Sequence, residues 1–246
     1  MMPQTPRPET STPRLEAPLD KLLDRLFASL DWHLLGSVYC DTGGDAFWEE
    51  HRKPALRQGR RWAEALAERL PQGGTSLYVG AGVAELPAML REVRSLGRRV
   101  LAGNLRVEEC SILDAGLRAV GVAPNELTIL PVDARSLCAQ GPFDHLSLVS
   151  ILSDPERWPV SSAVGYGRMP PVLLDVDTFV RERGEILALA SDLVAALRTP
   201  AWITTTAEEV PWLMHVAEVS GRSLESDDEM IETAIVGDPI GFLRLA

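Results

Sequence analysis

The sequence predicts an α/β fold: a doubly wound, mostly parallel sheet with a C-terminal antiparallel hairpin and an N-terminal helical extension. The main support is a change of pattern after "PQGG" at residues 71–74, where short apolar runs begin to alternate with amphipathic helical segments. That alternation is typical of βαβ units. A glycine turn follows the first apolar run, and two β-rich runs joined by "GDP" close the chain, which indicates a hairpin.

The length and charge of the chain narrow the class of protein. A chain of 246 residues can bury roughly 70% or more of its unfolded surface without staples. The formal net charge of -11 disfavours a nucleic-acid partner, because affinity for phosphate backbones comes from Lys and Arg. No segment approaches the ~20 apolar residues that span a membrane, and the first residues lack the apolar core of a secretory signal. We therefore expect a cytoplasmic protein with a small-molecule substrate, no nucleic acid and no membrane association.

The cysteines and histidines give no sign of a metal or redox site. The chain has three cysteines and four histidines, with no CxxC pair and no metal-ligand spacing. Cys110 and Cys138 are expected to be small buried apolar residues. His145 lies within a strand run without partner spacing, so we expect it to be a core residue.

The N-terminal part is predicted in two pieces. Residues 1–14 contain four prolines and four Ser or Thr residues, a composition typical of a disordered tail. Residues 15–72 are predicted to form a helical extension or lid, because leucines recur at helical spacing over 19–30 and 56–70. Gly36 is expected to end the first helix, residues 41–45 to form a turn, and a second helix to follow from Pro54.

An aromatic group lies between those two predicted helices. It consists of Tyr39, Phe47 and Trp48, with Asp41 beside them. One hypothesis is a lid over the substrate. The other, equally supported, is aromatic packing between the extension and the sheet.

Residues 73–246 are predicted to form one α/β domain. Strands are expected at 76–79, 100–103, 127–132 and 145–152, with helices at 85–96 and 107–120 between them. Residues 154–171 contain four prolines and are interpreted as a long loop after the fourth strand, a place where functional loops are common. A helix at 176–197, a strand in "AWITTT" at 201–206 and a helix in "EEVPWLMHVAEVSG" precede the hairpin.

The turn Gly80-Ala81-Gly82, between a strand and a helix, can bring backbone N–H groups to a ligand. A dinucleotide fingerprint would require glycine at position 85, where this chain has Glu85. A carboxylate there would repel a diphosphate, although it suits the positive end of a helix dipole. The turn therefore predicts a ligand that is not strongly anionic. A strand-to-helix turn without a ligand is the alternative.

Four stretches together resemble the motifs of class I S-adenosylmethionine-dependent methyltransferases. "LYVGAGVAELPAML" resembles the first motif, and "RRVLAGNLRVEECSILDAGLRAVG" resembles the second strand and helix. "LTILPVDARSL" is similar to the third strand with its Asp-Ala pair, and "FDHLSLVSILSD" to the fourth strand. They occur in the family's order over residues 73–154, and the resemblance implies S-adenosyl-L-methionine as the cofactor.

The resemblance also implies the cofactor-binding residues. The backbone of Gly80, Ala81 and Gly82 would meet the methionine end of the cofactor. Asn104, with Leu105 beside it, takes the place of the acid that binds the ribose hydroxyls. Further along, Asp133 would accept from the adenine amine, Ala134 would donate its N–H to a ring nitrogen, and Ser150 would lie behind the methyl donor.

Three positions depart from the family's pattern. Tyr78 replaces the acid of the first motif, Ala84 replaces the third glycine, and Asn104 replaces the ribose acid. Neutral hydrogen bonds are about half as strong as charge-assisted ones, so these departures predict weak cofactor binding or none. Asn104 also fits a helix N-cap, and Asp133 fits a plain loop.

The function that the sequence favours is methyl transfer from S-adenosylmethionine to a small molecule. This chemistry depends mainly on alignment, because the sulfonium is already an activated donor. No catalytic residue is assigned, and the oligomeric state is left open. Two alternatives are a catalytically inactive binding or scaffold protein with this fold, and a transferase of the aminopropyl type that uses the same cofactor.

Overall fold

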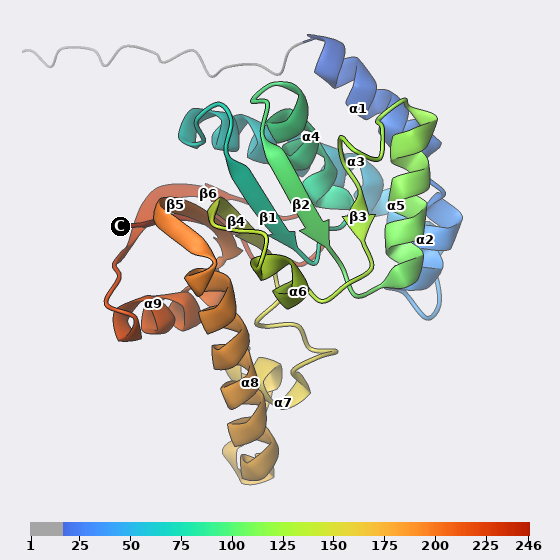
Figure 1. Ribbon diagram of the computed structural model, residues 1–246. Helices are drawn as coiled ribbons and strands as arrows, with labels where there is room; N and C mark the ends of the chain where they lie inside the picture. The colour runs from blue at the N-terminus through green and yellow to red at the C-terminus, as the bar shows by residue number, and fades with distance from the viewer. Residues whose placement is uncertain (1–16) are drawn as a thin grey trace, which may run out of the picture.

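The computed structural model describes residues 17–246, so the predicted tail at residues 1–14 lies outside the described part. A seven-stranded sheet in the order β3-β2-β1-β4-β5-β7-β6 forms its centre (Figure 1). The pairs among β1 to β5 are parallel, whereas β7 runs antiparallel to both of its neighbours. The predicted fold class is therefore confirmed. The strands are β1 (Thr75–Val79), β2 (Arg99–Gly103), β3 (Ile129–Leu130), β4 (Phe143–Leu148), β5 (Leu197–Thr206), β6 (Leu224–Ile231) and β7 (Ile240–Leu245).

Helices cover both faces of the sheet. One buried cluster joins the first face to α1 (Ala17–Ser29), α2 (Trp32–Tyr39), α3 (Gly44–Arg69), α4 (Leu86–Arg94) and α5 (Val107–Ala119). A second cluster joins the other face to α6 (Arg135–Cys138), α8 (Val176–Ala195) and α9 (Val210–Val219). Among residues 17–246, no helix combines the length and apolar character that a membrane span requires.

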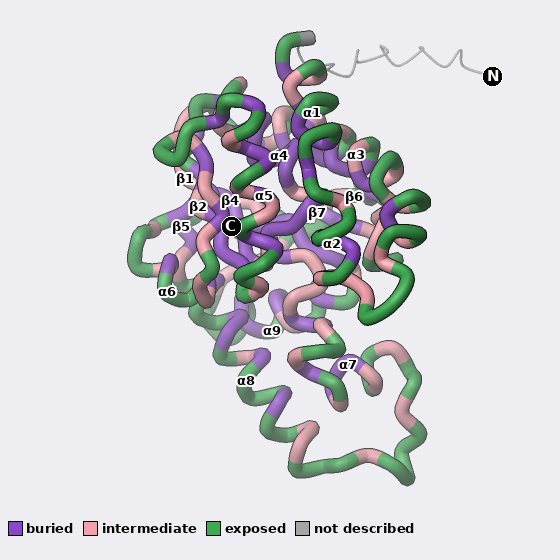
Figure 2. The backbone as a smooth tube through the Cα atoms, turned by 90° about the vertical axis from the view of Figure 1, so that its right-hand side faces the viewer, coloured by how far each residue is buried: buried purple, intermediate pink, exposed green. Residues whose placement is uncertain are grey.

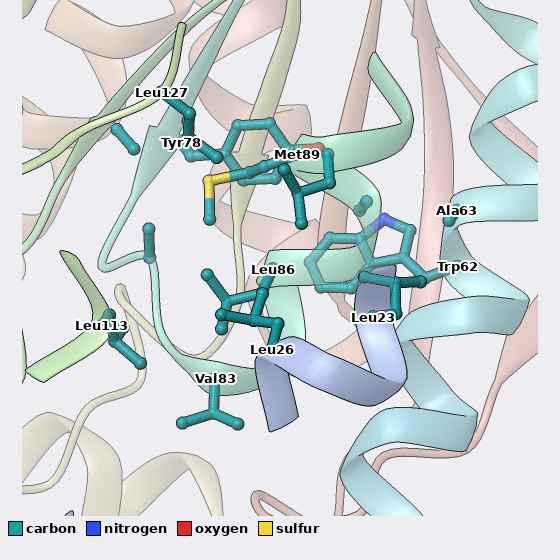
Figure 3. Close-up of a cluster of buried hydrophobic side chains, with 14 of the residues drawn as sticks. Leu23, Leu26, Trp62, Ala63, Tyr78, Val83, Leu86, Met89, Leu113 and Leu127 are labelled. Carbon is teal, nitrogen blue, oxygen red and sulfur yellow. The ribbon is translucent and has the colours of Figure 1, made fainter. Parts of the chain in front are cut away.

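The first cluster anchors the N-terminal helices to the sheet (Figure 3). Leu23 and Leu26 of α1 lie beside Trp62 of α3, and Leu86 and Met89 of α4 fill the space toward β1. All five side chains are fully buried. Because each such side chain contributes roughly 1.5–3 kcal/mol relative to an exposed one, the helical extension is part of the folded core.

Tyr78 of β1 points into this core and not toward the carboxyl edge of the sheet. Its hydroxyl donates to Glu92 Oε1 at 2.6 Å, and Glu92 Oε2 accepts from Arg98 Nε at 2.9 Å. The His145 ring lies 3.0 Å from Glu92 and 3.0 Å from the Thr204 hydroxyl. The aromatic residue that replaces the acid of the first motif thus belongs to a buried polar network, and His145 lies in the core.

The N-terminal helices differ from the prediction at Gly36. The residue does not end a helix, because it lies inside α2 and is buried there. A Cβ at Gly36 would lie 2.8 Å from the carbonyl carbon of Gly44, so the glycine permits close contact between α2 and the start of α3. The second helix begins at Gly44 and includes Pro54, which the sequence placed at its start. Pro54 removes one backbone hydrogen bond inside α3, and Trp48 in the early turns of the same helix is buried.

Other boundaries also differ. β3 is only two residues long, and β4 ends at Leu148, because the chain turns at Ser150 with a left-handed φ of 56°. Residues 154–171 are not one irregular loop, since they include α7 (Pro159–Gly165) and the start of the 3-10 turn η2 (Pro171–Leu173). α7 and the start of α8 project beyond the sheet, and many of their residues are exposed (Figure 2). The hairpin is present, although β6 lies earlier than predicted, in the acidic "LESDDEMI".

Candidate ligand site at the carboxyl edge of the sheet

The ends of β1, β2, β3 and β4 meet at one edge of the sheet, as parallel strands require. Two adjoining cavities open there, with volumes of about 310 Å³ for cavity A and about 380 Å³ for cavity B. Both are lined by Gly80, Asn104, Arg106 and Ile151, so they share one wall. Volumes of this size lie at the lower end of the range for small-molecule sites.

The predicted site residues lie around these cavities, with one exception. Gly80 and Asn104 line both. The others are divided between the two: Gly82 and Ser150 line cavity A, and Leu105, Asp133 and Ala134 line cavity B. Ala81 lines neither and is fully buried.

The glycine turn is hydrogen-bonded within the protein. Gly80 N and Ala81 N both donate to the carbonyl oxygen of Gly103, at 2.8 and 3.2 Å. Gly82 N donates to Glu85 Oε2 at 3.0 Å, from the short 3-10 turn η1 (Val83–Glu85). The three amides therefore already have acceptors, and a ligand anion would have to displace Glu85 to reach Gly82.

Asn104 connects the end of β2 to two neighbouring segments through side-chain hydrogen bonds. Its Nδ2 donates to the Ala81 carbonyl and to Glu109 Oε2, both at 3.0 Å, and its Oδ1 accepts from Arg106 N at 2.9 Å. One lone pair of Oδ1 remains for a ligand hydroxyl. The N-cap of α5 is Arg106, so the alternative of Asn104 as the helix cap is wrong.

Asp133 and Ala134 follow β3. The Asp133 carboxylate accepts from Arg135 N at 2.9 Å and from the Arg135 guanidinium at 3.0 Å, and this arginine holds the pKa of Asp133 below its usual value. Asp133 nevertheless lines cavity B. Ala134 N makes no hydrogen bond with any other described residue, so its donor is available at the start of α6.

Ser150 and Ile151 are fixed by a buried carboxylate that sequence reasoning missed. Glu209, in η3 (Ala207–Glu209), accepts from Ser150 N at 3.2 Å and Ile151 N at 2.5 Å, and also from the Thr205 hydroxyl at 2.8 Å. Burial raises the pKa of Glu209, and hydrogen bonds from donors that include Ile151 N and the Thr205 hydroxyl oppose that rise. The available signal was the capping-box spacing of Thr206 and Glu209 in "TAEE".

Cavity A contains further residues that the motifs did not identify. Glu109 of α5 is only 2% exposed and accepts from the Tyr39 hydroxyl at 2.5 Å. Gln58 of α3 lines the same cavity, and Arg106 pairs with Glu156 at 2.7 Å. Burial raises the pKa of Glu109, and it raises the pKa of Glu85 to about 7.

The aromatic group of the N-terminal part has two roles. Tyr39 packs edge-on against Trp48 with ring centroids 4.9 Å apart, and Phe47 contacts Trp48 at 5.0 Å. Trp48 is buried, which is the packing that one hypothesis expected. Tyr39 also lines cavity A, so α2 contributes a wall of the candidate site.

The strand order, the antiparallel β7 and the glycine turn after β1 define a class I S-adenosylmethionine-dependent methyltransferase-like fold. No family model and no curated protein sequence matches this chain. Among solved structures, TYW2 from Pyrococcus horikoshii in complex with MeSAdo is similar at 14% identity and a TM-score of 0.47, over 78% of this chain and 63% of that chain. TrmN from Thermus thermophilus is similar at 16% identity and a TM-score of 0.49, over 78% of this chain and 49% of that chain. The chain thus spans about half to two thirds of the length of these two proteins.

A third solved structure is closer to this chain in length. Precorrin-6y C5,15-methyltransferase from Geobacter metallireducens is similar at 13% identity and a TM-score of 0.42, over 75% of this chain and 87% of that chain.

Proposed function

We propose that the protein is an S-adenosylmethionine-dependent methyltransferase that acts on a small molecule. The observation that carries this proposal is the convergence of four strand ends on cavities A and B, each with residues that the methyltransferase resemblance identifies. Open α/β sheets bind ligands at this edge.

In this proposal cavity B holds the adenosine part of the cofactor. Ala134 has a free N–H for a ring nitrogen, Asp133 has carboxylate oxygens for the adenine amine, and Leu105 supplies apolar surface. The remaining lone pair of Asn104 Oδ1 is available to a ribose hydroxyl.

Cavity A then holds the sulfonium end and the methyl acceptor. When bound, the cofactor supplies an activated methyl group, so the protein's own residues have to align the acceptor and exclude water. The lining of cavity A includes Tyr39 and Gln58 from the N-terminal helices and Val236 from the loop between β6 and β7. This is the place where the extension of residues 15–72 would act as a lid.

A small, non-phosphorylated acceptor fits the charges of the site better than a nucleic acid does. Glu85, Glu109, Asp154 and Glu156 line cavity A, and Arg106 is its only cationic lining residue among those described. These carboxylates would repel a phosphate backbone, as would the net charge of -11.

The substitution Asp133→Ala tests this assignment. Calorimetry with S-adenosylmethionine should show binding that is weaker by roughly 10- to 150-fold, because the variant loses a hydrogen bond to a charged group worth about 1.5–3 kcal/mol. The matched control is Asp177→Ala, since Asp177 is exposed on α8 and lines neither cavity. Equal affinity for the two variants would contradict the assignment of cavity B.

A scaffold protein without cofactor is the second candidate. It is favoured by the glycine turn, whose amides all have acceptors within the chain, and by the bonds that already engage Asn104. Wild-type protein that gives no heat with S-adenosylmethionine or with S-adenosylhomocysteine would support this candidate over the enzyme.

A further inference from the structure

Two contacts that cross the carboxyl edge of the sheet separate cavity A from cavity B. Arg106, which follows β2, pairs with Glu156 from the segment after β4, with 2.7 Å between Nη2 and Oε2. Ile151, also after β4, lies against Gly80 at the end of β1, because a Cβ added to Gly80 would overlap Ile151 Cδ1 and lie 3.4 Å from its Cγ1. All four residues line both cavities, so these contacts form the wall between them.

The two contacts differ in how easily they open. The side chains of Arg106 and Glu156 are 35% and 72% exposed, and ion pairs at the surface contribute little to stability. Ile151 is partly buried and packs against the second hydrophobic cluster. Moving its side chain away from Gly80 therefore exposes apolar surface, which is unfavourable. Ile151 is thus the part of the wall that resists opening.

The backbone of Ile151 is held on both sides by buried side chains. Its N–H donates to Glu209 Oε1 at 2.5 Å, and its carbonyl oxygen accepts from Trp158 Nε1 at 3.0 Å. Glu209 is fully buried, and Trp158 is only 2% exposed. Because neither partner can follow a moving loop without leaving the core, the wall opens at this point by rotation of the Ile151 side chain.

Building on the proposed function, we infer that Ile151 is a specificity-determining gate between the two cavities. A nucleoside confined to cavity B binds with the gate closed. A nucleoside whose 5′ substituent continues into cavity A binds only after the Ile151 side chain has turned away from Gly80. The turned side chain is a minor state of the free protein, and minor states of this kind are populated at roughly 0.1–10%. The longer ligand therefore binds at least about tenfold more weakly than its own contacts would permit.

Calorimetric titrations of adenosine and S-adenosylhomocysteine test this gate. Adenosine reports on cavity B, whereas S-adenosylhomocysteine extends through both cavities in the proposed function. Ile151→Val removes Cδ1, the atom nearest to Gly80, and Ile151→Ala removes both γ carbons as well. Ile151→Ala should raise the affinity for S-adenosylhomocysteine relative to that for adenosine by about tenfold or more. Ile151→Val should raise this ratio in the same direction by a smaller factor.

The ratio of the two affinities distinguishes gating from a loss of structure, because a destabilised fold weakens the binding of both ligands together. Ile235→Ala is the matched control, since Ile235 is also partly buried and lines cavity A but not cavity B. This variant should not raise the ratio. An increase equal to that of Ile151→Ala would show that any enlargement of cavity A has the same effect, and it would overturn the inference.

A crystal structure of the complex with S-adenosylhomocysteine tests the rotation directly. We expect the Ile151 side chain to point away from Gly80, with its backbone still bonded to Glu209 and Trp158. The inference is overturned if the ligand extends through both cavities while Ile151 remains against Gly80. It is also overturned, with the proposed function left standing, if adenosine binds and neither Ile151 variant changes the affinity ratio. Absence of binding by both nucleosides to the wild type and to the variants would contradict the proposed function, and the inference with it.

Discussion

At the scale of single residues, Glu85 limits which ligands can bind at the glycine turn. It occupies the place where the dinucleotide fingerprint has a glycine, and its carboxylate caps Gly82 N at 3.0 Å. The sequence predicted that a carboxylate here excludes a diphosphate. It could not predict that Glu109, far along the chain, would lie close enough to raise the pKa of Glu85 further.

The raised pKa of Glu85 predicts a pH dependence of stability. Its pKa is raised from 4.5 to about 7 in the folded state, so between these values the native protein binds more protons than the unfolded chain. This contribution to the free energy of unfolding therefore falls as pH rises from about 4.5 to 7, by up to roughly 3 kcal/mol. Urea unfolding at pH 5 and pH 7.5 should show a smaller loss on going to pH 7.5 for Glu85→Gln than for the wild type. An equal change in both proteins would contradict the prediction.

At the scale of elements, a close backbone contact explains why a glycine lies inside a helix. The sequence treated Gly36 as a helix terminator, because glycine has a low intrinsic helix propensity. The structure uses the missing Cβ for contact between α2 and α3 at Gly44. Such a contact depends on tertiary packing, so helical periodicity in the sequence could not reveal it.

Two glycine-to-alanine substitutions distinguish a glycine that permits a close backbone contact from a glycine at an open helical position. Gly36→Ala should lower the free energy of unfolding by about 1–3 kcal/mol, because its Cβ would meet the backbone of Gly44. Gly184→Ala, at an open position in α8 with no atom within 4 Å of the added Cβ, should raise it by about 0.5–1 kcal/mol. Denaturant titration measures both values. A shift of the same sign in the two variants would contradict the account of α2 and α3.

At the scale of the whole molecule, the sequence predicted the sheet and the edge at which the candidate residues meet. The change of pattern at residues 71–74 marks the start of β1, and parallel strands place their carboxyl ends together, so Gly80, Asn104 and Asp133 meet there. The sequence did not reveal which residues lie near this edge only through contacts between distant parts of the chain. Tyr39 reaches Glu109 across 70 residues of sequence, and Glu209 holds Ser150 across 59.

A crystal structure of the protein grown with S-adenosylhomocysteine tests the central claim most directly, namely that cavities A and B together hold one sulfur-containing nucleoside. The account predicts continuous density through both cavities, with the adenine beside Asp133 and Ala134 in cavity B and the sulfur in cavity A. Cavities that contain only solvent at saturating ligand, or a nucleoside bound away from Asp133, would contradict it.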